Sequence, residues 1–512
     1  MKYKVSVIIP VYNVENYLDE TINSVLNQDI GFEDNVELIL VNDGSKDNSE
    51  EICLKYQKKY PNNVKYIYKD NSGVSDTRNL GYQNAHADYI MFLDADDKIN
   101  NKSLRLTSKF LDKHREAGFV ISRVKFFDAL KIWHYMDFRF KSHKKIVDIN
   151  SDIKYCQYHS TGILIRKETI KDTKFDKNVK FGEDMKFMAQ LLFNNGKFGI
   201  EKNSILYYRK RKEGTSAVQT QFRDKSYYIN TMRDSFKFIL DNAEKRYGEI
   251  PLYFKHYIMN SISERLLQRK LAFDIKDVLT DKEFKEYTDL YLYMLDKFDD
   301  DLILFQSRLS LNHKYYLLKL MHDKKFRIKK DINYDTVSFN EKSFKIKNTD
   351  ICKLISVKKD DADVVFNICV NDYIFDVKVL CNGKEAKLKK IKPNNAVATY
   401  LDVYFEKIYQ EKFYELRCKL SEFKSLEVLA NGKKTIFYTS GGIIKMNTYP
   451  CRCKKLGTKL LVFKKDKVVS VSRFIMIRKI LYKIRNIIYI IERDGISYTI
   501  NRVVGKIRWV NY

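Results

Sequence analysis

Three acidic side chains, Asp94, Asp96 and Asp97, stand directly after an apolar segment of the chain. If that segment is a strand, alternate side chains point to the same side, so Asp94 and Asp96 converge. Clustered carboxylate oxygens suit Mg²⁺ or Mn²⁺, and such a cation neutralises a departing diphosphate. The alternative is an acidic turn, which leaves three like charges crowded without compensation and costs stability. We therefore expect Asp94 and Asp96 to bind a divalent cation.

A second acidic pair, Glu183 and Asp184, follows Phe181 and Gly182 and precedes an amphipathic helical segment. One of these carboxylates can serve as a general base. Equally, acidic residues in the first turn of a helix stabilise it by facing its positive end. These residues alone leave both interpretations open.

Two polar turns contain residue types that bind nucleotides. In the first, Asp43 can accept hydrogen bonds from a base N–H or a ribose hydroxyl, and Gly44 permits a sharp turn. In the second, residues 71–81 form a small polar turn that opens a helix, and Arg78 adds a planar cation suited to a diphosphate. The alternative is two ordinary turns before capped helices, with a solvated arginine.

A basic, aromatic run over residues 207–212 precedes Gly214, Thr215 and Ser216. Such a loop can close on the phosphates of a ligand, or it can be a solvated run of charge.

Short apolar runs at residues 5–10, 36–41, 64–68 and 89–93 read as buried strands, with amphipathic helical segments between them. This alternation predicts an α/β fold with a mostly parallel sheet, whose ligands bind beyond the carboxyl ends of the strands. Polar motifs follow each of these ends, so we expect them to meet at one edge of the sheet.

The rest of the chain changes pattern twice. Residues 221–328 have apolar residues at helical spacing, and residues 329–466 alternate with a period of two. Asn382-Gly383 and Asn431-Gly432 each separate strand-like runs and predict hairpin turns. We expect a catalytic-type α/β domain over residues 1–220, a helical region over 221–328, antiparallel β-sandwich modules over 329–466 and a distinct segment over 467–512.

The last segment has an apolar stripe at helical spacing from Phe474 to Ile491, with basic residues on its other faces. A basic amphipathic helix of this kind binds an anionic membrane surface. Alternatively, its stripe packs against the β modules with the charges outward.

The net charge of +28 favours an anionic partner: a phosphate-bearing substrate, an acidic bilayer or nucleic acid. The basic residues form no nucleic-acid-binding motif, which argues against nucleic acid. The N-terminus has no signal-peptide pattern, and no uncharged apolar stretch approaches the ~20 residues of a membrane span. These features predict a cytoplasmic protein, with the inner face of the cell membrane as the surface that the last segment would bind.

Together and in this order, the motifs at residues 5–13, 42–45, 73–79, 92–97 and 183–184 resemble those of family-2 glycosyltransferases. The resemblance covers residues 3–220 and implies the GT-A fold, a Rossmann-like mixed sheet. It also implies a nucleotide-diphosphate-sugar donor such as a UDP-sugar, Mn²⁺ or Mg²⁺, and inversion at the anomeric carbon. The chain has no clear histidine in the closing loop to serve as a third metal ligand.

The resemblance implies a role for each matching residue. The catalytic base is Asp184, with Glu183 beside it, and the metal ligand is Asp96, with Asp94 on the metal or the ribose. The donor-binding residues are Pro10 and Tyr12 at the base, Asp43 at the uracil, Asn71 near the base, and Arg78, Arg211 and Ser216 at the diphosphate.

The overall layout is similar to that of enzymes that decorate wall teichoic acid in Gram-positive bacteria. This likeness implies a hexosyl- or N-acetylhexosaminyltransferase acting on a hydroxyl of a cell-envelope polymer or lipid-linked glycan, such as teichoic acid or capsular polysaccharide. It also implies β modules that bind polymer or form homo-oligomers. The alternative is a catalytically inactive scaffold that binds nucleotide-sugar or polymer, but the intact acidic motifs argue against it.

Overall fold

The computed structural model describes the greater part of the chain. The described residues are 3–211, 220–267, 277–304, 306, 309, 311–322, 327–329, 334–339, 342–347, 352–370, 376–391, 412–434, 438–439, 452–456, 459–463 and 467–471. The chain forms two units, the first being Met1–Arg265 with Ala272–Phe305 and the second Leu266–Leu271 with Gln306–Tyr512. The domain boundaries expected from the sequence stay a prediction.

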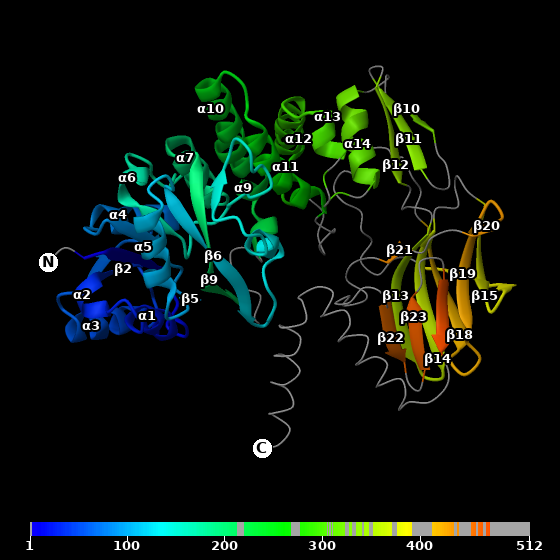
Figure 1. Ribbon diagram of the computed structural model, residues 1–512, viewed down its shortest axis with the longest axis horizontal. Coiled ribbons are helices and arrows are strands. Elements are labelled where there is room, and N and C mark those ends of the chain that lie inside the picture. The colour runs from blue at the N-terminus through cyan, green and yellow to red at the C-terminus, as the bar shows by residue number, and fades with distance from the viewer. Residues whose placement is uncertain are drawn as a thin grey trace. The chain divides into compact units, whose positions relative to one another are not determined.

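In the described residues, the first unit is built on a nine-stranded mixed sheet in the order β3-β2-β1-β4-β8-β6-β9-β5, with β7 beside β9. Figure 1 shows β2, β5, β6 and β9 of this sheet with helices around it. Strands β1, β2, β3 and β4 run parallel, and β8 is antiparallel to both β4 and β6. The predicted α/β class with a mixed sheet is confirmed. The strands are β1 Val5–Val11, β2 Val36–Asp43, β3 Val64–Lys69, β4 Tyr89–Phe92, β5 Lys98–Ile99, β6 Phe119–Asp128, β7 Ile146–Asp148, β8 Leu164–Arg166 and β9 Lys197–Lys210.

Four apolar segments were predicted to form buried strands, and three of them do. Every residue of β2 and β4 is buried, and so is all of β1 except Pro10. The prediction is wrong for β3, in which only Val64 is buried. The reason is that β3 is the edge strand of the sheet, so one side of it faces solvent.

Helices cover both faces of this sheet. Alternate side chains of β1, β2 and β4 pack with α1, α3 and α5 in one apolar core. The opposite face packs against α4 and α7, where Phe92 of β4 contacts Phe187. The helices are α1 Leu18–Leu26, α2 Phe32–Asn35, α3 Ser49–Lys59, α4 Val74–Gln83, α5 Ser103–Lys113, η1 Tyr135–Phe140, α6 Lys167–Ile170 and α7 Glu183–Asn194.

The predicted helical region follows this sheet, and its helical character is confirmed. Its helices are η2 Gln221–Arg223, α9 Lys225–Tyr228, η3 Thr231–Lys237, α10 Phe238–Tyr247, α11 Leu252–Leu267, α12 Asp281–Asp296, α13 Asp300–Leu304 and, in the second unit, α14 Leu311–His322. Among the helices that the structure describes, none combines the length and the apolar character needed to cross a bilayer.

Within its described residues, the second unit contains three sheets, ordered β10-β11-β12, β17-β18-β14-β13-β21 and β16-β15-β19-β24-β23-β22 with β20 beside β19. Its strands are β10 Arg327–Lys329, β11 Tyr334–Phe339, β12 Lys342–Lys347, β13 Cys352–Asp360, β14 Asp363–Val370, β15 Val377–Cys381, β16 Lys384–Glu385, β17 Lys389–Lys390, β18 Lys412–Lys419, β19 Ser425–Ala430, β20 Lys433–Lys434, β21 Tyr438–Thr439, β22 Arg452–Leu456, β23 Lys459–Phe463 and β24 Lys467–Val471.

The two larger sheets form the predicted sandwich. Phe366 and Ile368 of one sheet and Val379, Leu426 and Val428 of the other belong to a single buried cluster. All strand pairs of these two sheets are antiparallel except β13 with β21, which is a departure from the prediction.

Both predicted hairpin turns are confirmed. Asn382 and Gly383 connect β15 to β16, and Asn431 and Gly432 connect β19 to β20. All four residues have positive φ, as a two-residue type I′ turn requires. The predicted basic amphipathic helix lies outside the described residues.

Candidate active site

Several strands of the first sheet end at the same edge. β1, β2 and β4 are parallel, and their ends lead to Tyr12, Asp43 and Asp94. β6 has the same direction as β4 because β8 is antiparallel to both, and β9 is parallel to β6. Arg211, which follows β9, is therefore also at this edge. The expectation that the polar motifs share one edge of the sheet agrees with this topology.

Arg78, on α4, gathers three carboxylates from two other segments. Its Nη2 lies 2.8 Å from Oδ1 of Asp94, and its Nη1 lies 3.1 Å from Oδ1 of Asp184 and 3.3 Å from Oε1 of Glu183. One guanidinium thus connects the acidic residues after β4 with those that begin α7. We call Arg78, Asp94, Glu183 and Asp184 the arginine cluster.

The guanidinium of Arg78 is buried and also contacts an aromatic ring. It lies 5.1 Å from the ring centroid of Phe175, which stacks on Phe187 at 3.9 Å. Burial alone lowers the pKa of a guanidinium, but Asp184, Asp94 and Glu183 outweigh it, and the pKa of Arg78 is raised. Because one positive charge faces three carboxylates, the cluster keeps an excess of negative charge that another cation can neutralise.

The acidic pair is positioned by the start of α7. The preceding residue, Gly182, has φ +84°, and a Cβ there would lie 2.8 Å from Cγ2 of Thr231. Both carboxylates stand in the first turn, where the helix dipole stabilises negative charge. Burial and the adjacent Asp184 nevertheless raise the pKa of Glu183 to about 7. Glu183 therefore holds a proton up to near-neutral pH.

Two hydroxyl groups next to each other hold both carboxylate segments. The Oγ of Ser160 donates to Oδ1 of Asp184 at 2.6 Å. The Oγ1 of Thr161 accepts the backbone N–H of Asp94 at 3.1 Å. Neither residue was predicted from the sequence, because an isolated Ser-Thr pair before a short strand carries no distinctive signal.

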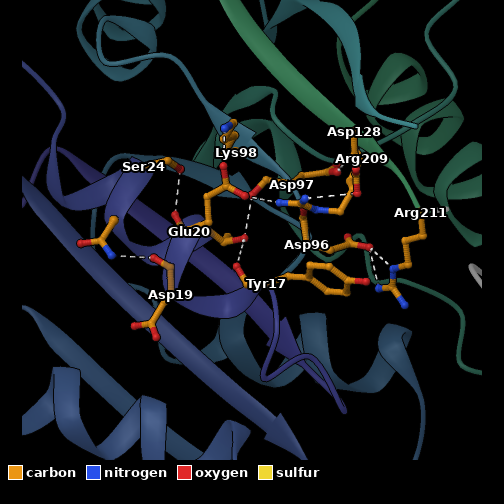
Figure 2. A network of polar contacts seen from close by, with 12 residues as sticks. Tyr17, Asp19, Glu20, Ser24, Asp96, Asp97, Lys98, Asp128, Arg209 and Arg211 are labelled. Atoms are coloured by element: carbon orange, nitrogen blue, oxygen red, sulfur yellow. Dashed lines mark hydrogen bonds and ion pairs between the residues drawn. The ribbon is translucent and has the colours of Figure 1, made fainter. Parts of the chain in front are cut away.

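Asp96 belongs to a second cluster, in which an arginine occupies its carboxylate. Oδ2 of Asp96 accepts from Nε of Arg211 at 2.8 Å and from Nη2 at 2.5 Å. Figure 2 shows this pair beside the ring of Tyr17, whose centroid lies 4.9 Å from the guanidinium of Arg211 and 4.8 Å from that of Arg209.

Arg209 fixes the backbone of the acidic motif. Its Nε donates to the backbone carbonyl of Asp96 at 2.9 Å, and its backbone N–H donates to Oδ1 of Asp97 at 2.8 Å. Its guanidinium also pairs with Glu20 on α1, which in turn binds Lys98 (Figure 2). These partners of Arg209 were not foreseen from the sequence, and the closing of the basic run on phosphates stays a prediction.

Asp97 is buried, and its Oδ2 has no hydrogen-bond partner in the described part of the chain. Burial, helped by Asp96 and Asp94, raises its pKa well above the usual value, and its Oδ1 accepts the backbone N–H of Arg209. Asp97 therefore acts on the structure of the turn, whereas Asp94 and Asp96 remain the candidates for a cation.

The fit of a divalent metal can be judged from these side chains. Within the described residues, no group of three or more His, Cys, Asp or Glu side chains forms a metal site. A Mg²⁺ or Mn²⁺ ion on a diphosphate commonly takes only one or two carboxylates from the protein and completes its shell with waters and phosphates. Asp96 and Asp94 interact, since burial and the charge of Asp94 raise the pKa of Asp96 while Arg211 lowers it, and a cation bound there would relieve that repulsion.

The predicted base-binding side centres on Asp43, the last residue of β2. Its Oδ1 accepts the N–H of Ser72 at 2.9 Å and also binds Lys69, and its Oδ2 accepts the N–H of Gly73 at 3.0 Å. A carboxylate has about four acceptor positions, so one remains for a ligand. Asn71, next to this turn, is exposed.

The loop after β1 is tied to the loop after β2. The N–H of Asn13 donates to Oγ of Ser45 at 3.1 Å, and Oδ1 of Asn13 accepts the N–H of Lys46 at 2.8 Å. The ring of Tyr12 is 49% exposed, and Pro10 is partly buried. Of the predicted donor-binding residues, only Ser216 lies outside the described part of the chain. The roles of all these residues stay predictions.

Comparisons with known proteins agree with this architecture. A family model described as glycosyl transferase family 2 matches residues 6–173. The chain is 33% identical over 367 residues to the minor teichoic acid biosynthesis protein GgaB of Bacillus subtilis (strain 168), covering 71% of this chain and 40% of GgaB. It is 32% identical over 321 residues to GgaA of the same organism, covering 62% of this chain and 72% of GgaA.

A third relative has solved structures. TarS of Staphylococcus aureus (strain Mu50), a poly(ribitol-phosphate) β-N-acetylglucosaminyltransferase, is 27% identical over 228 residues, covering 44% of this chain and 39% of TarS. Its crystal structure matches with a TM-score of 0.53 at 16% identity, covering 92% of this chain and 86% of that one. TarS 1–349 in complex with UDP-GlcNAc matches with a TM-score of 0.52 at 19% identity, covering 68% of this chain and all (100%) of that one. These structural matches confirm the predicted fold class. The chain spans less than half of GgaB and nearly three quarters of GgaA.

Proposed function

Because this chain belongs to glycosyl transferase family 2, we propose that it transfers a sugar from a nucleotide-diphosphate sugar to a hydroxyl of a cell-envelope polymer. The observation that carries the proposal is the arginine cluster. A candidate base, Asp184, and a candidate cation ligand, Asp94, are both bound to Arg78 although they come from separate segments. A structural ion pair needs one carboxylate per arginine, whereas this site holds an excess of them.

In the proposed mechanism, Asp184 removes the proton from the acceptor hydroxyl, which attacks the anomeric carbon opposite the leaving diphosphate. This single displacement inverts the anomeric configuration. Ser160 and Arg78 both contact Oδ1 of Asp184 and hold it in position. Glu183, whose pKa burial and Asp184 raise to about 7, changes the charge beside the base as the pH passes through that value.

Asp96 and Asp94 are the residues that would hold a divalent cation, Mn²⁺ or Mg²⁺. When bound, such an ion supplies positive charge to the diphosphate as it leaves. Arg211 would bind the diphosphate, because its guanidinium already lies at Asp96 and its planar N–H groups match phosphate oxygens. Tyr12, Asp43 and Asn71 would bind the nucleoside, consistent with the remaining acceptor position of Asp43.

For the donor we propose a UDP-sugar, and UDP-GlcNAc is the first to test because TarS was solved with it. For the acceptor we propose a teichoic acid-type polymer, since GgaB and GgaA are named for minor teichoic acid biosynthesis and TarS for poly(ribitol phosphate). A net charge of +28 suits such a polyanion. We place this reaction on the cytoplasmic side of the membrane, where nucleotide-sugars are made.

The experiment is a donor screen on the full chain with Mn²⁺ present, reading thermal unfolding and then transfer to purified poly(ribitol phosphate). A donor at 100 times its Kd stabilises the folded state by about 2.7 kcal/mol, so the correct nucleotide-sugar raises Tm the most. Equal Tm with every nucleotide-sugar, together with no transfer, would refute the proposal.

A further inference from the structure

A short segment beside the candidate active site exposes several apolar side chains. Leu130, Ile132, Tyr135 and Phe138 are between 40% and 51% exposed. They are four of the eleven exposed large hydrophobic residues among those described, and they fall within nine positions of the chain. Such a concentration on a surface marks an interaction site, whereas scattered single residues do not. We call residues 130–138 the apolar loop.

The apolar loop is held rigidly, so its exposed side chains are not explained by a loose backbone. The N–H of Phe126 donates to the carbonyl of Ile132 at 2.8 Å, and the N–H of His134 donates to the carbonyl of Val124 at 3.1 Å. The ring of Trp133 packs 3.7 Å from the guanidinium of Arg123. These bonds fix the segment along β6.

A buried arginine anchors the other end of the loop. Arg139, at the end of the loop, donates through Nη1 to Oε1 of Gln157 at 2.8 Å and through Nε to the carbonyl of Met136 at 3.2 Å. The fold therefore maintains an apolar surface in water, which costs free energy unless a partner covers it.

The exposed charged side chains within residues 129–145 have one sign. Lys131, Lys141, Lys144 and Lys145 are exposed, and Lys144 pairs with Asp152 at 2.6 Å. The only acidic residue in positions 129–145 is Asp137, which is buried and bound by Arg123 at 2.6 Å. Lysines interspersed with aromatic rings fit a chain that alternates phosphates with polyol or sugar units, because the ammonium groups contact phosphate and the rings cover C–H surfaces.

The loop is connected to the candidate base by a short path. The ring of His134 lies 6.5 Å from that of His159, and the next residue, Ser160, donates to Asp184 at 2.6 Å. His159 has its Nδ1 3.1 Å from the carbonyl of Thr161, so Nδ1 carries the proton, and the buried Nε2 acceptor has no partner among the described residues.

We propose that residues 130–138, with Lys131, Lys141 and Lys145, bind the polymeric acceptor, a polyol- or sugar-phosphate chain, as it leads to Asp184. The inference rests on the proposed function and names the surface by which that function reaches its acceptor. A membrane would also attract lysines and aromatic rings, but continuity with the base favours the polymer: the hydroxyl that Asp184 deprotonates must arrive along an adjoining surface.

The test uses the full chain and a synthetic ribitol phosphate oligomer as the probe. Tyr135→Ala with Phe138→Ala should weaken direct binding of the oligomer about tenfold and raise its KM by a similar factor, with kcat changed less than about twofold. The matched control is Tyr247→Ala with Leu252→Ala, which removes side chains of similar exposure elsewhere in the first unit and should change neither constant. Thermal unfolding of both double variants verifies that they fold.

An unchanged KM and unchanged oligomer binding in the Tyr135/Phe138 variant would overturn this inference. So would an unchanged KM with lost binding to phosphatidylglycerol vesicles, which would make the loop a membrane surface. If the wild-type chain shows no sugar transfer or donor hydrolysis at all, the proposed function fails. Direct oligomer binding would still report separately on the loop.

Discussion

Nη1 of Arg78 lies 3.1 Å from Oδ1 of Asp184, the same oxygen that accepts a hydrogen bond from Ser160. That oxygen has two donors in place, so the other oxygen of Asp184 is the one best able to take a proton from an acceptor. The position of the base is therefore determined by α4 as well as by its own helix, α7.

Asp184→Asn should lower transfer about 10²–10⁴-fold, because an amide cannot accept the proton of the acceptor hydroxyl. Donor binding should persist, since Asn keeps the shape and can still accept from Arg78. The measurements are initial rates with donor and polymer, and the donor-induced rise in Tm. Asp29→Asn is the control, since Asp29 pairs with Arg105 near the surface. Transfer by D184N within tenfold of the wild type would exclude Asp184 as the base.

Arg78→Met should destabilise the protein by about 3–5 kcal/mol, because it leaves three carboxylates near one another without their shared cation. The loss should be greater at about pH 8 than at about pH 5.5, where the carboxylates can take up protons. Denaturant unfolding at the two pH values measures this difference.

Arg78→Lys should recover part of the stability but little of the transfer rate. A lysine keeps the charge, yet its single ammonium cannot bridge Asp94 and Asp184 as the planar fork does. Arg105→Lys is the matched control at an exposed pair. If Arg78→Lys transferred sugar at the wild-type rate, the geometric role of the guanidinium would be wrong.

The raised pKa of Glu183, about 7, predicts the pH dependence of the enzyme. When Glu183 loses its proton it adds a negative charge beside Asp184 and makes Asp184 a stronger base, so transfer should rise with pH through about 7. Glu183→Gln cannot gain that charge, so the rise through about pH 7 should disappear from the profile. A profile of kcat against pH for both proteins tests this, and coincident profiles would contradict it.

The raised pKa of Glu183 also makes the free energy of unfolding depend on pH. Folding raises the pKa of Glu183, so its folded state favours the protonated form. The contribution is fully present below the ordinary value of 4.5 and is lost as the pH rises through about 7. Glu183→Gln should therefore be less sensitive than the wild type to a change from about pH 5 to about pH 8 in urea unfolding.

The strand ends were predictable from the sequence because buried parallel strands read as continuous apolar runs, and the polar residue after each run must lie at the ligand edge. The edge position of β3 was not predictable, because the apolar run of one strand does not say which strands lie next to it in the sheet. Asp96 and Asp184 were named from the sequence as site residues, which stays a prediction, but their partners were not foreseen: Arg78 is 106 positions from Asp184, and Arg211 is 115 from Asp96.

There is a physical reason why these partners could not be predicted from the sequence. A side chain's partner at long range depends on how helices pack, and packing is set by many apolar contacts at once. Arg78 illustrates this: the sequence identified a planar cation at a helix start and predicted a diphosphate contact, which stays a prediction. Its three carboxylate partners follow only once α4 and α7 are placed on the same face of the sheet.

Arg211 should compete with a divalent cation for Asp96, because both carry positive charge to the same oxygen. Arg211→Ala should therefore tighten binding of Mn²⁺ in the absence of donor, yet slow transfer because the diphosphate loses a cation. Thermal shift against Mn²⁺ concentration measures the first effect and initial rates the second. Asp96→Ala should abolish the Mn²⁺ shift. Weaker Mn²⁺ binding by R211A would contradict competition.

Gly81→Ala should destabilise the protein by about 1–3 kcal/mol through overpacking. Gly81 lies on α4, three residues after Arg78, and a Cβ there would fall 2.3 Å from Cγ2 of Ile8 on β1. Helix α4 therefore lies so close to β1 that residue 81 has no room for a side chain. Arg78 contacts its carboxylates from the same helix. Urea unfolding measures the loss, and transfer should fall with it because α4 has to move outward.

The control is Gly196→Ala, whose added Cβ would lie 3.4 Å from Ile149, an ordinary contact, at a backbone conformation that alanine accepts. Its stability should change by less than about 1 kcal/mol. Ile8→Ala combined with Gly81→Ala should cost less than the sum of the two single changes, because the first removes the methyl group that the second strikes. Strict additivity would show that α4 does not depend on this close approach, and the placement of Arg78 would need another cause.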